Sequence, residues 1–371
     1  MEMDAPVIVV GAGAAGLASA ACLKRDGVPS LVLEAGDDVA TTWRSLYDRL
    51  RLHTVRQLSG LPGYAMGRAY GKYAPRDQVV AYLRDYVRIN GLSIRTSHPV
   101  TAARRDGSRW IVTTPQGELA AQALVSATGI FSNPDVVSYP GQADFAGEVT
   151  NASAYKNPAA FAGKRVLIVG SGNTGAEIAV DLADAGVATT ISIRAGANVV
   201  PRDLLGVPIQ RWAHVISALP RVVTKPLSSV MLASSTRRQV RAGLPRPTQS
   251  ILDRPGVPII GLRLLDLTRA GVVKVRPGID RFTPAGVRFA DGREEPFDTV
   301  LYATGYRPAL DWLGDLITRD AGGFPSHDGV RSTDQPNLYF VGMNYNIQGT
   351  LFNIAHEAPE AARLIKASLA R

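Results

Sequence analysis

Two glycine-rich segments are the residues whose spacing most directly implies chemistry. Gly11–Gly16 reads GAGAAG and Gly170–Gly175 reads GSGNTG, so both follow the pattern G-x-G-x-x-G. The first glycine of this pattern permits a tight turn, the second lets a pyrophosphate approach the backbone, and the third lets a helix pack against a strand. The free N–H groups at the start of that helix then face the phosphates. Each segment therefore predicts a dinucleotide site.

The elements that must position these loops are present on both sides of each loop. The apolar runs Val7–Val10 and Lys164–Val169 precede the loops, as buried parallel strands would. Leu17–Arg25 and Ala176–Ala185 follow the loops with small residues at helical spacing. A glycine motif between a strand and a helix is a stronger signal than the motif alone. Glycine turns without a ligand are therefore disfavoured for this pair.

The residue after the next strand of each unit distinguishes the two nucleotides. Leu31–Leu33 ends in Glu34, where a carboxylate accepts hydrogen bonds from a ribose diol. Thr189–Ile193 ends in Arg194, which favours a 2′-phosphate, and Arg202 adds to the same pocket. The alternative for Arg194 is an exposed arginine at a strand end. The second site is predicted to bind NADP(H), and two sites in one chain suggest electron transfer between two dinucleotides.

Bulk composition narrows the class of protein. The 371 residues suit about two domains. Cys22 is the one cysteine, so no disulfide forms within the chain and dithiol chemistry on a flavin is excluded. The short apolar run at Val7 leads straight into the glycine loop and is not a signal peptide, which predicts a cytoplasmic location. No apolar stretch is long enough to span a bilayer.

The net charge of +9 has two readings. Basic proteins bind nucleic acid when their arginines cluster, but here the arginines are dispersed. We therefore expect the charge to attract an anionic cofactor and acidic substrates, with no nucleic-acid partner.

An internal repeat defines the expected architecture. The small-residue turn Ala127–Gly129 follows one buried strand, and Ala303–Gly305 repeats it after another. The fold class is therefore α/β, with two Rossmann-like dinucleotide-binding domains, the second inserted into a discontinuous first. The predicted boundaries are 1–157 and 298–371 for the first domain and 158–297 for the second. Prolines near 206–250 indicate a helical insertion that covers a site, with membrane contact as the alternative.

Two further segments carry polar groups with open roles. Trp43 and Arg44 either lie along a bound dinucleotide or pack and order a loop. Tyr47–Pro62 is basic and irregular, so it either lines a cavity or is a solvated loop. In the first case His53, Arg56 and Gln57 are candidates to meet a substrate carboxylate.

Stretches distributed over nearly the whole chain resemble the class B flavin-containing monooxygenases, and within them the plant YUCCA-type enzymes. They are GAGAAG, TTWR, YDRLRLH followed by LP, SATG, FAGEVTNASAYK, GSGNTGAEIA, VPRDLLG, RPGIDRFTPAGVRFADG, DTVLYATGY and NLYFVG. The resemblance implies that the first loop binds FAD and the second binds NADPH. It also implies that NADPH reduces the flavin and that a C4a-hydroperoxyflavin formed with O2 transfers one oxygen atom to a substrate. The cofactor then carries the chemistry, which agrees with a sequence that shows no metal cluster and no nucleophile triad.

One position departs from the family fingerprint FxGxxxHxxxY. Phe145, Gly147 and Tyr155 match it, but Asn151 replaces the histidine. Asparagine donates and accepts hydrogen bonds but cannot titrate. Either the histidine has a positional role that Asn151 preserves, or oxygenation suffers and the protein acts as an NADPH oxidase or reductase.

The predicted site residues form two groups, with no metal ligand among them. The candidates for catalysis are Asn151, Tyr155 and Arg56. The candidates for cofactor binding are Gly11, Gly13, Ala14, Gly16, Glu34, Trp43, Arg44, His53, Val100, Ala127, Thr128, Gly129, Gly170, Gly172, Asn173, Thr174, Gly175, Arg194, Arg202, Ala303, Thr304, Gly305, Gly342 and Gln348.

The leading functional prediction is an FAD- and NADPH-dependent monooxygenase of a small molecule. Its reaction is either oxidative decarboxylation of a 2-oxo acid such as indole-3-pyruvate, or N- or S-oxygenation. The alternatives are an NADPH-dependent flavin oxidase or reductase that forms H2O2, and a non-catalytic nucleotide sensor. The predicted partners are the small molecule and O2, and a homodimer is left open.

Overall fold

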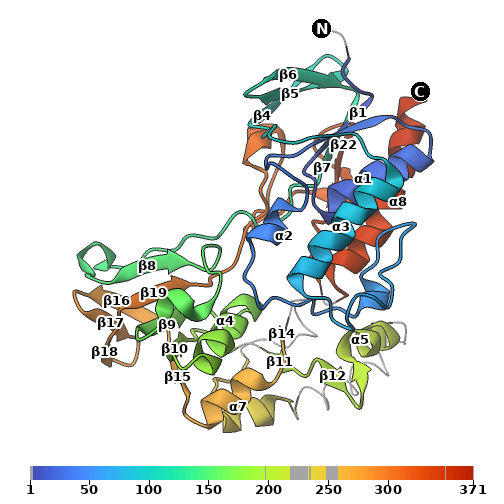
Figure 1. Ribbon diagram of the computed structural model, residues 1–371. Coiled ribbons are helices and arrows are strands. Elements are labelled where there is room, and N and C mark those ends of the chain that lie inside the picture. The colour runs from blue at the N-terminus through green and yellow to red at the C-terminus, as the bar shows by residue number, and fades with distance from the viewer. Residues whose placement is uncertain are drawn as a thin grey trace.

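The computed structural model describes residues 3–196, 198–217, 233, 235–247, 258–346 and 348–370. Figure 1 shows two lobes, each built on a parallel sheet, with the two chain termini close together on the upper lobe. The upper lobe contains the first glycine loop and the lower lobe contains the second. The α/β class with two dinucleotide-binding domains is thus confirmed.

The first domain is built on a seven-stranded sheet with the order β20-β21-β22-β7-β1-β2-β3. Within it, β1 (Val7–Val10) pairs in parallel with β2 (Ser30–Leu33) and β7 (Ala123–Ser126). All three strands are apolar, because both faces of the sheet are covered. The other strands are β3 (Ile94–Arg95), β20 (His327–Asp328), β21 (Arg331–Ser332) and β22 (Leu338–Phe340).

Three helices cover one face of this sheet, and they lie side by side in Figure 1. They are α1 (Ala14–Arg25), α3 (Arg76–Asn90) and α8 (Thr350–Leu369). The small residues of α1 are almost all buried, which lets α8 pack closely on it. The opposite face carries the antiparallel sheet of β4 (Ala102–Asp106), β5 (Arg109–Thr114) and β6 (Gly117–Ala121).

The second domain repeats this plan. Its five-stranded parallel sheet has the order β15-β10-β9-β19-β8. Helices α4 (Asn173–Asp184) and α7 (Arg263–Arg269) pack on one face, and the antiparallel strands β16, β17 and β18 pack on the other. The strands are β8 (Glu148–Asn151), β9 (Arg165–Val169), β10 (Ala188–Ser192), β15 (Val273–Arg276), β16 (Ile279–Thr283), β17 (Gly286–Phe289), β18 (Glu294–Pro296) and β19 (Thr299–Tyr302).

The predicted domain boundaries at 157/158 and 297/298 do not coincide with the division between the two sheets. Strands β8 and β19 both belong to the second sheet, although both were assigned to the first domain. The chain crosses between the lobes near residues 127–135 and 303–309, and these two segments pair with each other. Thr128 Oγ1 donates to the carbonyl of Ala309, and Thr304 Oγ1 donates to the carbonyl of Asp135, both at 2.7 Å. Burial alone did not reveal which sheet each apolar strand would join.

Short elements connect the larger ones. Part of the predicted insertion is helical, because α5 covers Ile209–Ser217 and residues 235–241 form helix, but 218–232 and 248–257 lie outside the described residues. The remaining helices and 3-10 turns are α2 (Thr41–Ser45), Arg56–Leu58, Gln142–Asp144, Pro158–Phe161 and Asp311–Leu316. The remaining strands are β11 (Val199–Val200), β12 (Asp203–Leu204), β13 (Val207–Pro208) and β14 (Ile259–Ile260).

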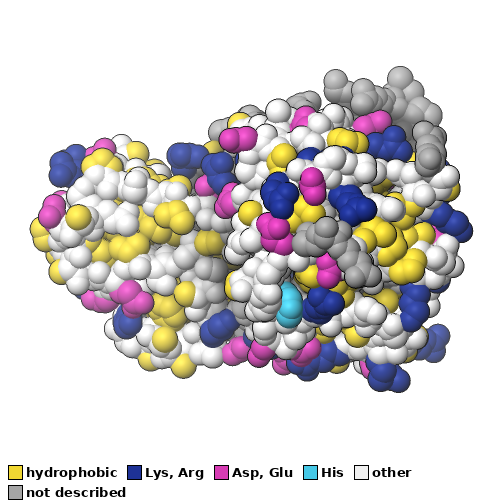
Figure 2. All heavy atoms as spheres, turned by 90° about the horizontal axis from the view of Figure 1, so that it is seen from above, with side chains coloured by type: hydrophobic (Ala, Val, Ile, Leu, Met, Phe, Trp, Pro, Cys, Tyr) yellow, Lys and Arg dark blue, Asp and Glu magenta, His cyan; other side chains and the backbone are white. Residues whose placement is uncertain are grey.

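The surface agrees with the reading of the net charge. On the face drawn in Figure 2, basic and acidic side chains are interspersed rather than gathered into a single-sign patch. Within the described ranges, no helix combines the length and the apolar character that crossing a bilayer would require. The same ranges contain no group of three or more His, Cys, Asp or Glu side chains placed to hold a metal ion.

Candidate active site

A cavity of about 1470 Å³ lies between the two domains and reaches both glycine loops. Gly11 and Gly13 line it from the first loop, and Asn173 and Thr174 line it from the second. Pockets that enclose a single drug-sized ligand measure about 300–1,000 Å³, so this cavity has room for more than one. The two predicted nucleotide sites are therefore parts of one continuous space.

The first loop has the geometry of a dinucleotide cradle. Gly11 has φ +104°, and a Cβ added there would lie 2.7 Å from the carbonyl oxygen of Ala127, so the fold itself requires glycine. Gly13 differs, because its φ of −80° and ψ of −174° suit any residue and no protein atom lies within 4 Å of an added Cβ. The space beside Gly13 is thus left for a ligand, as a bound pyrophosphate needs.

Glu34 closes the first cradle at the end of β2. It is 7% exposed and lines the cavity. Its Oε2 accepts from the backbone N–H of Ala12 at 2.7 Å, and its Oε1 accepts from that of Gly36 at 2.9 Å. These bonds hold the carboxylate at the loop, and a carboxylate retains further lone pairs for ribose hydroxyls. The residues present therefore fit FAD.

The second loop repeats the feature that points to a ligand. Gly172 has φ −82° and ψ 178°, and nothing lies within 4 Å of an added Cβ. Asn173 has a different role from the predicted one, although it lines the cavity. Its Nδ2 donates to the carbonyl of Pro258 and its Oδ1 accepts from the N–H of Ile260, both at 2.8 Å. Asn173 thus ties the loop to β14.

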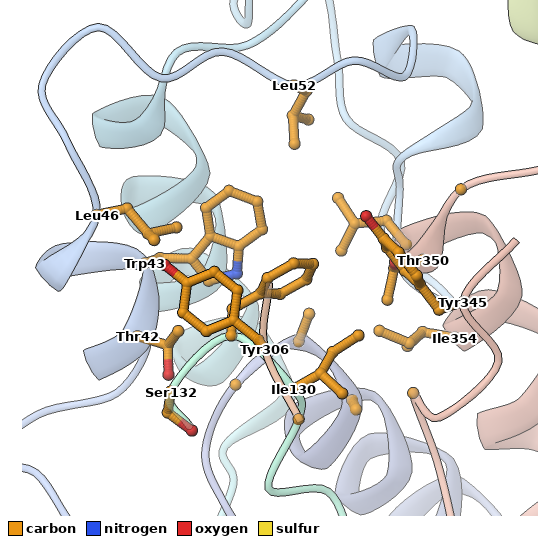
Figure 3. A pocket seen from close by; sticks show the side chains of 18 of the residues that line it. Thr42, Trp43, Leu46, Leu52, Ile130, Ser132, Tyr306, Tyr345, Thr350 and Ile354 are labelled. Carbon is orange, nitrogen blue, oxygen red and sulfur yellow. The ribbon is translucent and has the colours of Figure 1, made fainter. Parts of the chain in front are cut away.

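The cavity wall between the loops is apolar and rich in rings. Figure 3 shows Trp43, Leu46, Leu52, Ile130 and Ile354 around it, with Tyr306 and Tyr345 facing the same space. Phe131 also lines the cavity, and its ring lies 5.7 Å from that of Tyr306 and 5.8 Å from that of Tyr345. Such a wall accommodates a flat ring system and disfavours water.

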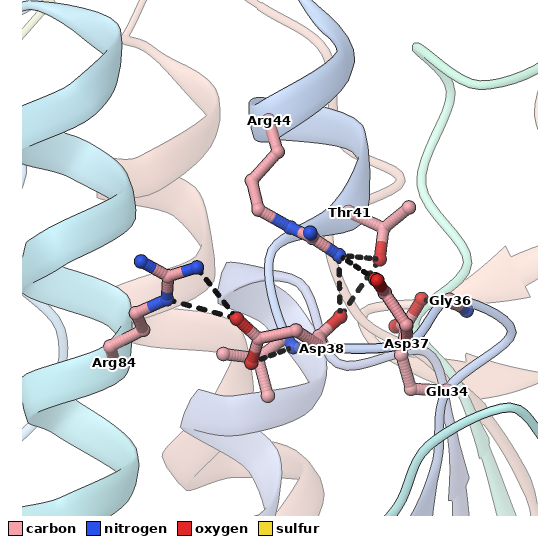
Figure 4. A network of polar contacts seen from close by, with 8 residues as sticks. Glu34, Gly36, Asp37, Asp38, Thr41, Arg44 and Arg84 are labelled. Carbon is pink, nitrogen blue, oxygen red and sulfur yellow. Dashed lines mark hydrogen bonds and ion pairs between the residues drawn. The ribbon is translucent and has the colours of Figure 1, made fainter.

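Arg44 lies outside the cavity lining and contacts the turn beside it. Its guanidinium donates to Asp37 Oδ1 at 2.6 Å and to the carbonyl of Asp38 at 3.3 Å, while Arg84 holds the Asp38 carboxylate from α3 (Figure 4). This contact holds the pKa of Asp37 below its usual value. The network orders the turn that follows Glu34. Of the pair, only Trp43 lines the cavity.

His53 and Arg202 meet at Glu177, in the second turn of α4. His53 Nε2 lies 3.4 Å from Glu177 Oε1, and Arg202 Nη2 lies 3.6 Å from the same oxygen. Burial lowers the pKa of His53, and the Glu177 carboxylate opposes that shift. His53 lines the cavity, whereas Arg202 stacks over Tyr73 at 5.1 Å and does not. Arg202 is therefore held by protein contacts, and its role as a phosphate ligand stays a prediction.

The three side chains predicted as catalytic lie outside the cavity lining. Tyr155 is 2% exposed and donates to Asp181 Oδ2 at 2.7 Å. Asn151 ends β8, and its Oδ1 accepts from the N–H of Ser153 at 3.0 Å. Arg56 reaches only the carbonyl of Tyr70, at 3.4 Å. Each side chain serves the fold, so direct contact with a reacting substrate is not supported for any of them.

The predicted cofactor-binding residues fall into two groups, those that line the cavity and those that lie outside its lining. Arg194 is exposed two residues beyond β10 and packs over Gly278. Gly175 lets α4 approach Gly170, as predicted, because an added Cβ would lie 2.5 Å from the Gly170 carbonyl oxygen. The cavity is lined by Gly11, Gly13, Ala14, Glu34, Trp43, His53, Val100, Ala127, Thr128, Gly129, Asn173, Thr174 and Gly342. The predicted residues outside its lining are Gly16, Arg44, Gly170, Gly172, Gly175, Arg194, Arg202, Ala303, Thr304, Gly305 and Gln348.

Sequence reasoning missed most of the apolar wall. Phe131 and Tyr306 follow the two Ala-Thr-Gly turns, so the internal repeat was a usable signal for them. Leu52 and Gln210 belong to two segments for which a cavity or a covered site was expected, but neither residue was singled out, and no pattern indicated Tyr345.

We predict that replacing Asn151 with alanine lowers stability without changing the reaction. The change removes the hydrogen bond to Ser153, which is worth about 1 kcal/mol. The melting temperature should fall, while the oxygenated product formed per NADPH consumed stays at the wild-type value. A switch to H2O2 formation in Asn151→Ala would instead assign this position a part in the oxygen chemistry.

Comparisons with known proteins agree with this geometry. Residues 8–203 match the family described as pyridine nucleotide-disulphide oxidoreductase. The fold and the cavity thus define an oxidoreductase with two dinucleotide sites. Indole-3-pyruvate monooxygenase YUCCA1 of Oryza sativa subsp. japonica is 36% identical over 90% of this chain and 86% of its own. The chain therefore belongs to the YUCCA-type class B flavin-containing monooxygenases.

Two further likenesses support this membership. The probable indole-3-pyruvate monooxygenase YUCCA1 of Arabidopsis thaliana is 34% identical over 90% of this chain and 84% of its own. A flavin monooxygenase mutant from Stenotrophomonas maltophilia has a similar structure, with a TM-score of 0.79, 28% identity and full coverage of both chains. The predicted enzyme class and the predicted cofactors, FAD and NADPH, are confirmed by this family membership.

Proposed function

We propose that this enzyme uses NADPH and O2 to oxygenate a small molecule by oxidative decarboxylation of a 2-oxo acid, such as indole-3-pyruvate, or by N- or S-oxygenation. The observation that supports this proposal is one cavity that reaches both glycine loops and continues along a ring-lined wall. Indole-3-pyruvate is the substrate in the names of the relatives, and an indole ring suits a wall that carries Trp43, Tyr306 and Tyr345.

The chain's own groups bind, orient and exclude water. The N–H groups at the start of α1 and α4 would face the two pyrophosphates, and Glu34 would accept hydrogen bonds from ribose hydroxyls at the first site. The start of α8 brings a positive helix end to the cavity through Gly349 and Thr350. FAD, when bound, supplies the redox and oxygen chemistry. The protein has to keep the two rings aligned in a space that water does not enter.

Besides His53, the cavity lining offers two arginines that could meet a substrate carboxylate. Arg56 lies outside the lining, whereas Arg51 and Arg238 belong to it. Arg238 also lies 3.6 Å from Asp266, so Arg51 is the stronger candidate. We predict that Arg51→Ala raises KM for a 2-oxo acid about 10-fold, because a charge-assisted hydrogen bond contributes roughly 1.5–3 kcal/mol. An uncharged thioether substrate, assayed as control, should keep its KM.

The test of the function is turnover with NADPH under ¹⁸O2. The expected result is a product that carries one ¹⁸O atom for each NADPH oxidised. Stoichiometric H2O2 with no labelled product, across 2-oxo acids, amines and thioethers, would overturn the proposal in favour of an NADPH oxidase.

The cytoplasmic location and a homodimer remain predictions, and light scattering of the FAD-loaded protein tests the predicted homodimer.

A further inference from the structure

The carboxylates of α4 face the first domain. Glu177, Asp181 and Asp184 are spaced i, i+4 and i+7, which places them on one side of the helix. The same helix begins at the second glycine loop, so its orientation determines where that loop points. Side chains from residues 47–53 of the first domain contact all three carboxylates. Arg202, Tyr155 and Arg263 contact them as well.

Glu177 makes the contacts closest to the cavity. Tyr47 Oη donates to its Oε2 at 2.5 Å, while His53 Nε2 lies 3.4 Å from its Oε1. Tyr47 and His53 both line the cavity, although both belong to the first domain. Burial, followed by the Glu177 carboxylate, raises the pKa of Tyr47 well above its usual value, so Tyr47 is a hydrogen-bond donor at neutral pH.

The other two carboxylates, Asp181 and Asp184, extend this contact away from the cavity. Arg49 lies 3.4 Å from Asp181 and 2.8 Å from Asp184. Arg49 is 45% exposed, and exposed pairs contribute little. Glu177 is 21% exposed and has a buried tyrosine donor, and removing one partner from such a group is costly. Glu177 is thus the most constrained direct link between the nucleotide helix of one domain and the cavity wall of the other.

We propose that Glu177 is a positioning residue for hydride transfer, because its carboxylate holds α4 in register with Tyr47 and His53 of the flavin domain. This inference rests on the proposed function, since it assumes that NADPH at the second loop reduces a flavin at the first. The transfer moves one hydride, which is two electrons and a proton, and it oxidises NADPH to NADP⁺. Misplacement of reacting atoms by about 1 Å can cost about 100-fold in rate.

The test compares Glu177→Ala and Glu177→Gln with the wild-type holoenzyme. We expect the rate constant of anaerobic flavin reduction at saturating NADPH to fall about 10- to 100-fold in Glu177→Ala. Glu177→Gln should recover part of the loss, because an amide oxygen still accepts from Tyr47. FAD content and the Kd for NADP⁺ should stay within about 3-fold of wild type, since neither cradle includes Glu177. Hydrogen exchange in residues 47–53 should accelerate in Glu177→Ala.

The matched control is Glu295→Ala in the second domain. Glu295 is 23% exposed and pairs with Arg276, so it resembles Glu177 in residue type and burial. It lies on β18, away from the three carboxylates of α4. This control should lower the melting temperature and leave the rate of flavin reduction unchanged.

Three outcomes would overturn the inference. They are a wild-type reduction rate in Glu177→Ala, a fall in rate matched by a fall in NADP⁺ affinity or FAD content, and an equal fall in rate in Glu295→Ala. Failure of the proposed function is distinguishable. A wild-type enzyme that NADPH reduces but that forms no oxygenated product would overturn the proposed function alone.

Discussion

Replacing Gly13 with alanine is expected to yield a folded but colourless protein. The backbone at Gly13 suits alanine, and an added Cβ meets no protein atom within 4 Å, so stability should stay at the wild-type value. The methyl group would instead occupy the space that a pyrophosphate needs. Loss of one or two charge-assisted hydrogen bonds weakens FAD binding about 100-fold. Flavin absorbance per polypeptide and the melting temperature of the apoprotein measure the two effects.

Two neighbouring glycines provide the controls. Gly11→Ala should be destabilised by about 1–3 kcal/mol, because its φ of +104° and the Ala127 carbonyl both oppose a side chain. Gly172→Ala should keep its flavin but lose reduction by NADPH, since the same open space lies at the second loop. Wild-type flavin content in Gly13→Ala would contradict the assignment of the first loop to FAD.

Replacing Arg194 with alanine is expected to remove the preference for NADPH over NADH. Arg194 lies two residues beyond the end of β10, one residue further along than Glu34 lies after β2, and so near the place where a doubly wound domain meets the ribose of its nucleotide. It is exposed, so its guanidinium is accessible to a 2′-phosphate. The Kd for NADPH should rise about 10- to 100-fold, the equivalent of roughly 1.5–3 kcal/mol, while that for NADH changes less than about 3-fold.

Arg202→Ala is the matched control for this prediction. The Arg202 guanidinium is held by Glu177 and by the Tyr73 ring, so its loss should affect both nucleotides alike. Titration of the FAD-loaded enzyme with each nucleotide gives the four dissociation constants. Equal weakening of NADPH and NADH binding in Arg194→Ala would show that the 2′-phosphate is held elsewhere.

The parts of the fold that follow local patterns were predictable. The apolar stripe of helix α3 (Arg76–Asn90) and the following Gly91 are local signals, so the sequence indicates both the helix and its end. Strand β4 was missed, since Ala102–Asp106 reads AARRD and lies half exposed on an outer sheet. The sheet that β8 and β19 join could not be read from local patterns, because both strands find their partners across long stretches of sequence.

The sequence by itself determined the two cradles and the class of enzyme. The glycine spacing, Glu34 and the repeated Ala-Thr-Gly turns act within a few residues of one strand end, so no knowledge of the rest of the chain was needed to interpret them. The same holds for the family motifs, which are contiguous stretches.

Only the tertiary structure decided which side chains share the space between the cradles. Trp43 lines the cavity while its neighbour Arg44 turns to Asp37, and Asn151 and Tyr155 are drawn into fold-supporting hydrogen bonds. The wall that brings Phe131, Tyr306 and Tyr345 together comes from three separate segments. The direction in which a side chain points depends on partners that are distant in sequence, and a contiguous motif does not include those partners.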